Sequence, residues 1–443
     1  MSPLSALLLL AVTAAPAAAA TDDRYRFAAG QSEEHAVTLA RTPEGVSFTW
    51  DRPSGSGWDT ALLAIRSAGA EARPYVDIDA GGARIQQHLD ANALGLRWLN
   101  LSSLRGQLTN GASVQIRTHG VTIEPAATTV RLFANKLDLQ GRILIIAPHP
   151  DDAEIAAFGL YAERNATIVT VTSGNAGDFN YRASVSDPAE HYRLKGYLRA
   201  VDSVTVPWQG GIPPERCFNL GYFDARLQTM RQNPTTPVSE MYGPNQDVEP
   251  YRRANIGRLL PVESRAATWK NLVDDLGQVL RKVRPDVIVM PHPALDNHSD
   301  HQYASVAAAE ALEGWDGKAT FLLYTNHASE NRYPFGPANT VVSLPPWNAS
   351  DIAVERVYSH PVGPVLQRRK LFALESMHDL RLSPDEQDTC SLPGLQRRPD
   401  YPRVPEVDYF RRGPRPEELF FVFGRDGVRE VIRTFLGQPA TIE

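Results

Sequence analysis

The sequence predicts an α/β protein with a mostly parallel sheet, preceded by a β-sandwich domain. Three observations lead to this fold class. An apolar, β-branched run at 142–147 is followed by a helical stretch from residue 153, and a similar run at 287–290 is followed by an Ala-rich helical stretch at 303–312. Short continuous apolar runs of this kind are typical of buried parallel strands. Residues 21–135 instead alternate apolar and polar residues between turns spaced about ten residues apart, which favours a β-sandwich.

Length and composition place the chain among ordinary globular proteins. It has 443 residues, enough for two or three domains, with 42% hydrophobic and 22% charged residues. The formal net charge of −6 gives no indication of the positively charged surface that nucleic-acid-binding proteins carry. We therefore expect no nucleic-acid partner.

Residues 1–20 resemble a secretory signal peptide. They carry no charged side chain, and an apolar core from Leu4 to Val12 is followed by four alanines that end at Ala20. We expect cleavage after Ala20 and export to the periplasm or the medium. An uncleaved anchor, or a misassigned start in a cytoplasmic protein, stays open as an alternative. No other run is long enough to span a bilayer, so no integral membrane span is expected after signal removal.

The tryptophans of the N-terminal region and the two cysteines each leave two alternatives open. The three tryptophans of the predicted β-sandwich domain (21–135), Trp50, Trp58 and Trp98, could stack on sugars or could belong to its core. Cys217 and Cys390 are the only cysteines. They could form a disulfide in an exported protein or remain two buried thiols.

The first chemically distinctive segment lies where the 142–147 strand ends. His149 and Asp152 offer one nitrogen and one oxygen, a ligand mix that zinc accepts. Asp151 lies between them and is well placed to take a proton from water beside a metal. The alternative is that the two aspartates cap the following helix while His149 is an ordinary loop residue.

The second distinctive segment follows the 287–290 strand. It contains His298, Asp300 and His301 just before the Ala-rich helix. Ligand sites of open α/β sheets lie at the carboxyl ends of the strands, so the two segments can meet in one crevice. His301 could supply the third metal ligand, which would leave His298 free to act on a substrate.

Further candidates lie on the remaining loops. The 167–172 strand runs into a segment in which Gly174 lets the backbone approach a ligand closely or makes a tight turn. Arg193, on a helix, could hold a substrate hydroxyl or face solvent, and Asp224 follows a further strand. A long loop at 228–264 is typical of a lid or binding wall, with the candidate glycan contacts Tyr242, Tyr251, Arg252 and Arg253.

These residues together resemble the PIG-L/LmbE-like family of zinc-dependent N-acetylglucosaminyl deacetylases. The resemblance spans about 141–380 and rests on His149-Pro-Asp-Asp152, on His298-x-Asp300-His301, and on segments at 172–178, 220–224 and 370–378. The family's R-x-x-E helix is only partly kept, because Gly196 stands where Glu is expected.

The resemblance implies a Rossmann-like deacetylase domain at 136–382, followed by an extension at 383–443 that packs on the core. It implies Zn²⁺ held by His149, Asp152 and His301, although Fe²⁺ suits the same ligands. Asp151 would act as the base. His298, oriented by Asp300 with a raised pKa, would stabilise the oxyanion or protonate the leaving amine.

The implied reaction is removal of an N-acetyl group from an N-acetylhexosamine in a cell-surface polysaccharide or lipopolysaccharide. Arg193, Gly174 and Asp224 would contact this N-acetylated sugar substrate. Two alternatives stay open: an amidase acting on a small glycosylated thiol or its conjugate, and a glycan-binding protein without turnover. The sequence does not determine the oligomeric state.

Overall fold

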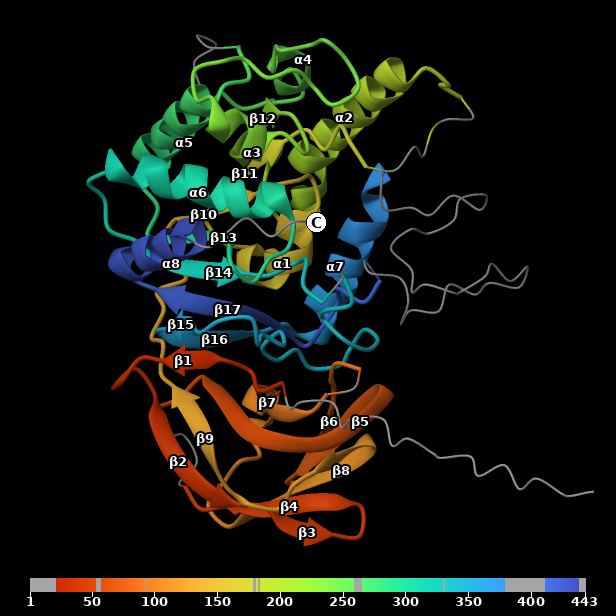
Figure 1. Cartoon of the computed structure of the whole chain (residues 1–443), viewed down its shortest axis with the longest axis vertical. Coiled ribbons are helices and arrows are strands. Elements are labelled where there is room, and N and C mark those ends of the chain that lie inside the picture. The colour runs from red at the N-terminus through yellow and green to blue at the C-terminus, as the bar shows by residue number, and fades with distance from the viewer. Residues whose placement is uncertain are drawn as a thin grey trace, which may run out of the picture.

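The computed structural model describes residues 21–52, 57–91, 93–177, 181, 184–258, 265–329, 331–378 and 411–437. A β-rich N-terminal body lies against one edge of a larger α/β body (Figure 1). The predicted signal peptide and Cys390 lie outside the described residues, and Cys217 is a buried thiol. Within the described part of the chain, no helix has the length and apolar character needed to cross a membrane.

The N-terminal body is built around one long, bent strand. Strand β5 (Thr60–Ala80) pairs with β7 and β9 through its first part and with β6 and β8 through its second. The strands form one connected antiparallel sheet, which confirms a β-rich N-terminal region. The other strands are β2 (Glu33–Thr38), β3 (Ala40–Thr42), β4 (Gly45–Trp50), β6 (Ala83–His88), β7 (Gly95–Asn100), β8 (Ala112–Ile123) and β9 (Ala127–Phe133), with a short helix η1 at Ser102–Leu104.

The three tryptophans of this body are core residues. Trp50, Trp58 and Trp98 are 0%, 4% and 7% exposed. Trp50 and Trp58 pack on each other in the core of the sheet, and Trp98 packs on Phe27 at the boundary with the α/β body. Of the two alternatives, the core placement is therefore confirmed and sugar stacking is excluded, because the ring faces are already covered by protein.

The α/β body contains a mixed seven-stranded sheet in the order β12-β11-β10-β13-β14-β17-β16. Its first five strands run parallel, and β17 and β16 are antiparallel to their neighbours. The mixed α/β class is thus confirmed. The strands are β10 (Ile143–Ala147), β11 (Ala166–Thr172), β12 (Cys217–Tyr222), β13 (Val287–Pro291), β14 (Thr320–Tyr324), β16 (Arg356–Pro361) and β17 (Glu417–Phe423).

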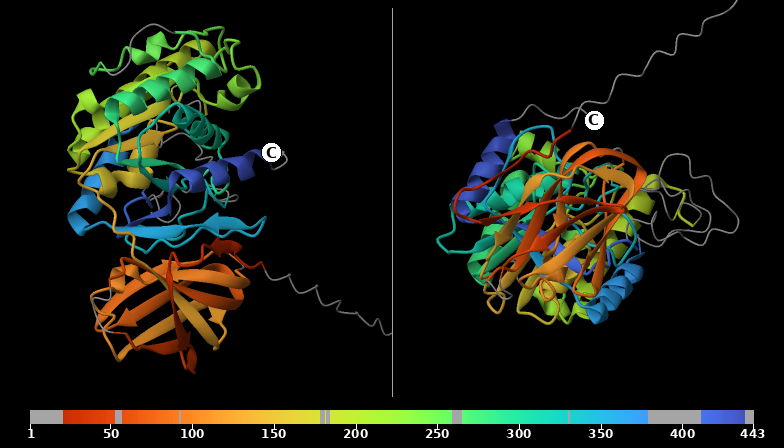
Figure 2. Two further views of the ribbon diagram at one scale, coloured as in Figure 1. Left: turned by 90° about the vertical axis from the view of Figure 1, so that its left-hand side faces the viewer. Right: turned by 90° about the horizontal axis from the view of Figure 1, so that it is seen from below.

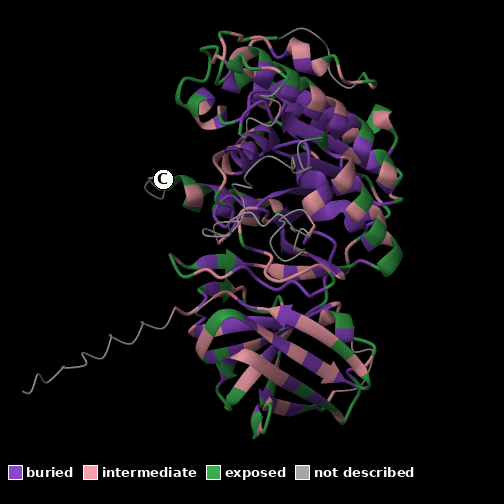
Figure 3. Ribbon diagram, turned by 90° about the vertical axis from the view of Figure 1, so that its right-hand side faces the viewer, coloured by how far each residue is buried: buried purple, intermediate pink, exposed green. Residues whose placement is uncertain are grey.

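Helices cover both faces of this sheet (Figure 2). One apolar core includes residues of α5, α6 and α8, and the other includes residues of α1 and α7. The sheet strands between them are buried along nearly their whole length (Figure 3). The helices are α1 (Asp152–Tyr161), α2 (Pro188–Thr205), α3 (Leu227–Gln232), α4 (Glu249–Arg252), α5 (Trp269–Val283), α6 (Ser299–Glu313), α7 (Pro364–Ser376) and α8 (Arg425–Gly437), with short helices η2 (Val206–Gly210) and η3 (Pro214–Arg216).

Segments from the two ends of the chain join the bodies. Strand β1 (Tyr25–Phe27) pairs in parallel with β15 (Ile352–Val354), and β17 lies inside the large sheet between β14 and β16. Asn100 of β7 donates from Nδ2 to Glu417 of β17 at 2.5 Å and to the backbone oxygen of Val342 at 2.7 Å. The C-terminal segment therefore takes part in the sheet itself.

Candidate metal centre

The carboxyl ends of all five parallel strands meet at one place. The segment after β10 supplies His149, Asp151 and Asp152, and the segment after β13 supplies Asp296, His298, Asp300 and His301. Gly174, Asp224 and Asn326 follow β11, β12 and β14. Parallel strands bring such loops together because their carboxyl ends lie at the same edge of the sheet.

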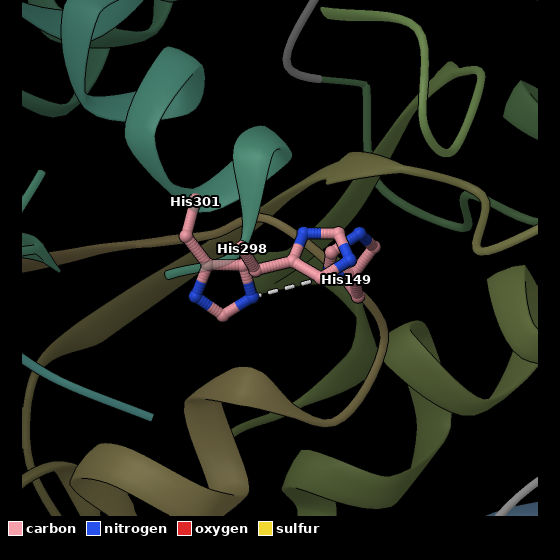
Figure 4. A group of neighbouring side chains, drawn as sticks. All are labelled: His149, His298 and His301. Carbon is pink, nitrogen blue, oxygen red and sulfur yellow. Dashed lines mark hydrogen bonds between the residues drawn. The ribbon is translucent and has the colours of Figure 1, made fainter. Parts of the chain in front are cut away.

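Three side-chain atoms at this edge form a compact triangle. Nδ1 of His149 lies 3.3 Å from Oδ2 of Asp152 and 3.2 Å from Nε2 of His301. The same Oδ2 lies 3.0 Å from Nε2 of His301. The two imidazoles turn these nitrogens toward each other (Figure 4). These are the three residues that the family resemblance implies as metal ligands.

Both imidazoles of the triangle are anchored by carboxylates through their other ring nitrogen. Nε2 of His149 lies 3.2 Å from Oδ1 of Asp224 and 3.3 Å from Oδ2 of Asp300. Nδ1 of His301 lies 3.0 Å from Oδ2 of Asp296. A carboxylate that accepts the second N–H of a metal-binding histidine fixes the tautomer and the ring orientation.

Asp152 is held just as firmly. Its Oδ2 accepts the backbone N–H of His149 at 2.8 Å, and its Oδ1 accepts from Nδ2 of Asn326 at 2.7 Å. It lies at the first position of α1 and is 1% exposed. The carboxylate is therefore fixed by two strand-end loops.

The electrostatics of the triangle favour a cation between its atoms. Burial alone would lower the pKa of His301, but Asp152 and Asp296 outweigh it and raise that pKa to about 9. Burial likewise opposes protonation of His149, yet the Asp224, Asp152 and Asp300 carboxylates hold its pKa well above the usual range. The surrounding negative charge thus draws positive charge to the two ring nitrogens.

The residues fit a divalent metal. Zinc bonds to nitrogen and oxygen are about 2.0–2.2 Å long, so ligand atoms of a tetrahedral site stand roughly 3.3–3.5 Å apart. The triangle edges of 3.0–3.3 Å are close to that spacing. The ligand atoms of His149, His298 and His301 lie within 4.8 Å of one another, as do those of Asp152, His301 and His327. His298 and His327 therefore border the same centre.

Asp151 does not cap α1. Its side chain makes no capping hydrogen bond to that helix, although the residue occupies the N-cap position. It forms a buried ion pair instead, in which Nη2 of Arg199 lies 3.0 Å from Oδ2 of Asp151. The helix-capping alternative for Asp151 is therefore wrong.

His298 differs from expectation in its partner and in its pKa. Nδ1 of His298 accepts the backbone N–H of Asp300 at 3.3 Å, so the backbone of Asp300 orients the ring. The Asp300 carboxylate accepts from the backbone N–H groups of Ala225 and Leu227 and faces His149. Burial, together with the neighbouring imidazoles, holds the pKa of His298 well below its usual range. The expectation that the Asp300 carboxylate raises this pKa is wrong, because it points at another histidine.

The three expected substrate contacts fall in different places. Asp224 is buried against His149, and Gly174 lies beside Arg199 with a φ of +66°. Both are part of the cluster. Arg193 is exposed on α2.

The long loop that begins at residue 228 carries both buried residues with structural contacts and exposed residues. Tyr251 is fully buried and donates from its hydroxyl to Glu240 at 3.0 Å, and Arg252 pairs with Asp275. These two residues support the loop, in contrast to the expectation that they contact a glycan. Tyr242 is 38% exposed and stacks on Tyr192 with ring centroids 3.8 Å apart.

Sequence reasoning missed three members of this cluster. Asp296 accepts from His301 and from the backbone N–H groups of Asn326 and His327, and Asn326 holds Asp152. Arg199 pairs with Asp151. Asp296 lies within the second distinctive segment, so its position in the sequence could have identified it as a candidate. Arg199 and Asn326 had no signal of their own, because only the packing of α2 and the position of β14 bring them to the centre.

Comparisons with known proteins agree with this geometry. Residues 144–312 match the family model PIG-L, described as GlcNAc-PI de-N-acetylase. No curated protein sequence matches the chain.

Solved structures also match the chain, and three of them have TM-scores below 0.5. The 4-carboxy-2-hydroxymuconate hydratase GalB of Pseudomonas putida KT2440 is 16% identical and covers 54% of this chain and 79% of its own, with a TM-score of 0.27. An acetyl xylan esterase, Est2A, of the rumen bacterium Butyrivibrio proteoclasticus is 9% identical and covers 69% of this chain and 89% of its own, with a TM-score of 0.18. The CBM22-1-GH10 modules of the Clostridium thermocellum xylanase Xyn10B are 8% identical and cover 67% of this chain and 79% of their own, with a TM-score of 0.16.

The family match covers both histidine-bearing segments and all three atoms of the triangle. Residues 144–312 of this chain therefore belong to the PIG-L/LmbE-like family.

Proposed function

We propose that this protein is a metal-dependent hydrolase that removes the acetyl group from an N-acetylhexosamine in a glycoconjugate. The observation that carries the proposal is the triangle of His149, Asp152 and His301, with the buried Asp151 next to Asp152 in the chain. The family description, GlcNAc-PI de-N-acetylase, supports an N-acetylated sugar as the substrate class. The parallel strand order β12-β11-β10-β13-β14 supports a Rossmann-like core beneath the site.

The ligand set would hold Zn²⁺, with Fe²⁺ as the alternative ion. When bound, such an ion polarises a carbonyl and lowers the pKa of water. Asp151 then takes the proton that water loses as it attacks the acetyl carbon. Asp151 suits this role because it adjoins a ligand in sequence and its buried carboxylate is held by Arg199.

His298 is suited to donate a hydrogen bond. Its Nδ1 accepts from a backbone N–H, so a neutral ring carries its proton on Nε2. This tautomer donates a hydrogen bond to the carbonyl oxygen as negative charge develops there, and Asp151 passes the proton taken from water to the leaving nitrogen. His298 then acts through its neutral form, in accord with its lowered pKa.

We also propose that the mature protein is exported, supported by the apolar, uncharged N-terminal sequence. A cell-surface polysaccharide or lipopolysaccharide is the substrate source that fits export. Sequencing of the N-terminus of the protein recovered from the producing cell tests this point. A start at Thr21 is expected, and a retained Met1 on a cytoplasmic product would contradict it.

The reaction is tested by acetate release from a panel of N-acetylglucosamine conjugates and surface polysaccharides. The purified protein is assayed as isolated, after chelation, and after zinc is restored. The proposal predicts acetate release that chelation abolishes and zinc returns. Stoichiometric bound metal without release of acetate from any panel member would favour the glycan-binding alternative.

A further inference from the structure

Helix α2 packs closely on Asn175 and Tyr251 at Gly196. A Cβ atom at this residue would lie 2.6 Å from Cβ of Asn175 and 2.8 Å from Cε1 of Tyr251. Neither distance is possible for ordinary carbon atoms, so the helix can pack here only without a side chain. This packing explains why glycine stands where the family pattern has Glu.

One turn later, on the same face of α2, Arg199 fills the space next to the loops. The residue is 7% exposed. Its Nη2 lies 3.0 Å from Oδ2 of Asp151 and 3.5 Å from the backbone oxygen of Pro150, and its Nη1 lies 3.3 Å from the backbone oxygen of Gly174. The guanidinium thus links the loop after β10 to the loop after β11.

The second loop is shaped to receive this guanidinium. A Cβ atom at Gly174 would lie 2.6 Å from Nη1 and 2.7 Å from Cζ of Arg199. The φ of +66° at Gly174 also disfavours any other residue. Two glycines, one on the helix and one on the loop, therefore make room for one arginine.

A planar guanidinium fixes the direction of a carboxylate, whereas an ammonium group acts as a single point of charge. Arg199 contacts Asp151 together with the backbone oxygens of Pro150 and Gly174 on the two loops. Its contacts therefore hold the carboxylate in place relative to His149 and Asp152, which lie on the same short segment. Misplacement of a reacting group by about 1 Å can lower a rate by roughly 100-fold.

We propose that Arg199 is a positioning residue that orients the Asp151 carboxylate for proton transfer, in a role made possible by Gly196 and Gly174. This proposal rests on the proposed deacetylase function. It assigns to Arg199 an effect on turnover through Asp151, with no contact of its own with the metal.

The test uses the full-length protein and the variants Arg199→Met and Arg199→Lys, with Arg281→Met, on an exposed turn of α5, as the matched control. We expect kcat to fall about 100-fold in Arg199→Met and about 10-fold in Arg199→Lys. KM and zinc content should stay within about threefold of the wild-type values, because substrate contacts and ligands are intact. The control should match the wild type.

Three results would overturn the proposal: a kcat of Arg199→Met within about threefold of wild type, a rise in KM with kcat unchanged, or loss of zinc in parallel with activity. If Arg199→Met does not fold, Arg199→Lys decides, and an unchanged kcat in that variant would overturn the proposal.

Crystal structures of the wild-type and Arg199→Lys proteins give a readout that does not depend on turnover. The Asp151 carboxylate is expected to rotate or shift in the variant, and an unchanged position would overturn the proposal even if the wild type released no acetate. Failure of the proposed function and failure of this inference are thereby separate results.

Discussion

Nδ1 of His149 lies 3.2 Å from Nε2 of His301, although the two residues are 152 positions apart in the chain. Two ring nitrogens at this distance repel each other when both carry a lone pair. The contact is stable only with a proton or a metal ion between them, and the Asp152 oxygen completes a triangle around that position. This relationship suits the centre to a divalent metal ion.

Replacement of His301 by alanine should abolish both metal binding and acetate release. The variant loses one of three ligands and leaves the buried Asp152 and Asp296 carboxylates without their cationic partner. Metal content after gel filtration and acetate release measure the two effects. His119→Ala, on the N-terminal body, is the control and should behave as the wild type. A His301→Ala protein that retained a full equivalent of zinc would refute the ligand assignment.

Replacement of Asp296 by asparagine should weaken metal binding without removing a ligand. Asp296 accepts from Nδ1 of His301 and from two backbone N–H groups, and it fixes the tautomer of that histidine. Loss of such a partner typically lowers metal affinity 10- to 100-fold. Competition with a chromogenic chelator measures the change. Equal affinities of the variant and the wild type would mean that Asp296 does not act on the metal centre.

Gly196→Ala should destabilise the protein. The added methyl group would overlap Asn175 and Tyr251, which are buried and hydrogen-bonded to each other. Overpacking of this kind costs about 1–3 kcal/mol in the free energy of unfolding. Gly277→Ala, on α5, is the control, because the atoms nearest its Cβ are the flexible end of Arg281. Urea unfolding compares the two variants, and a Gly196→Ala midpoint equal to that of the control would show that α2 can shift.

Much of the centre could be predicted from local sequence. The apolar strand at 143–147 is followed closely by histidine and aspartate side chains that can bind a metal. The strand at 287–291 is likewise followed by a segment with histidines and aspartates. Both segments lie at strand ends, where the geometry of a parallel sheet brings them together.

The rest depended on long-range packing that local sequence does not specify. Arg199 and Arg193 look alike in sequence, and only the close approach of α2 at Gly196 decides which is buried. The Asp300 carboxylate turns away from His298 because the backbone N–H groups of Ala225 and Leu227 attract it. The place of β17 between β14 and β16 likewise follows from sheet pairing across the chain.

Unfolding free energy should fall between about pH 4.5 and pH 7 because of Glu417. Burial raises the pKa of this carboxyl from 4.5 to about 7 against the opposing bonds from Ser103 and Ser359. The folded state then binds more protons than the unfolded state in this window, so its contribution to stability is complete below pH 4.5 and is lost as the pH rises through 7. The slope from one such group is at most about 1.4 kcal/mol per pH unit.

The variant Glu417→Gln isolates this effect, because glutamine stays neutral at every pH in the window. The urea-unfolding free energy of the wild type, taken relative to that of Glu417→Gln, should fall from pH 4.5 to pH 7. Above pH 7 it should stay constant. If this relative free energy does not change with pH, the pKa of Glu417 is not raised in the folded protein.

The central claim is that Asp151 acts as the proton acceptor of a metal-dependent hydrolase, and Asp151→Asn tests it most directly. Acetate release and bound zinc are measured on the same sample of the full-length variant, with the wild type alongside. The account predicts wild-type zinc content and loss of nearly all acetate release, because the amide keeps the shape of the side chain but cannot take the proton. Acetate release at the wild-type rate from a zinc-loaded variant would contradict the account.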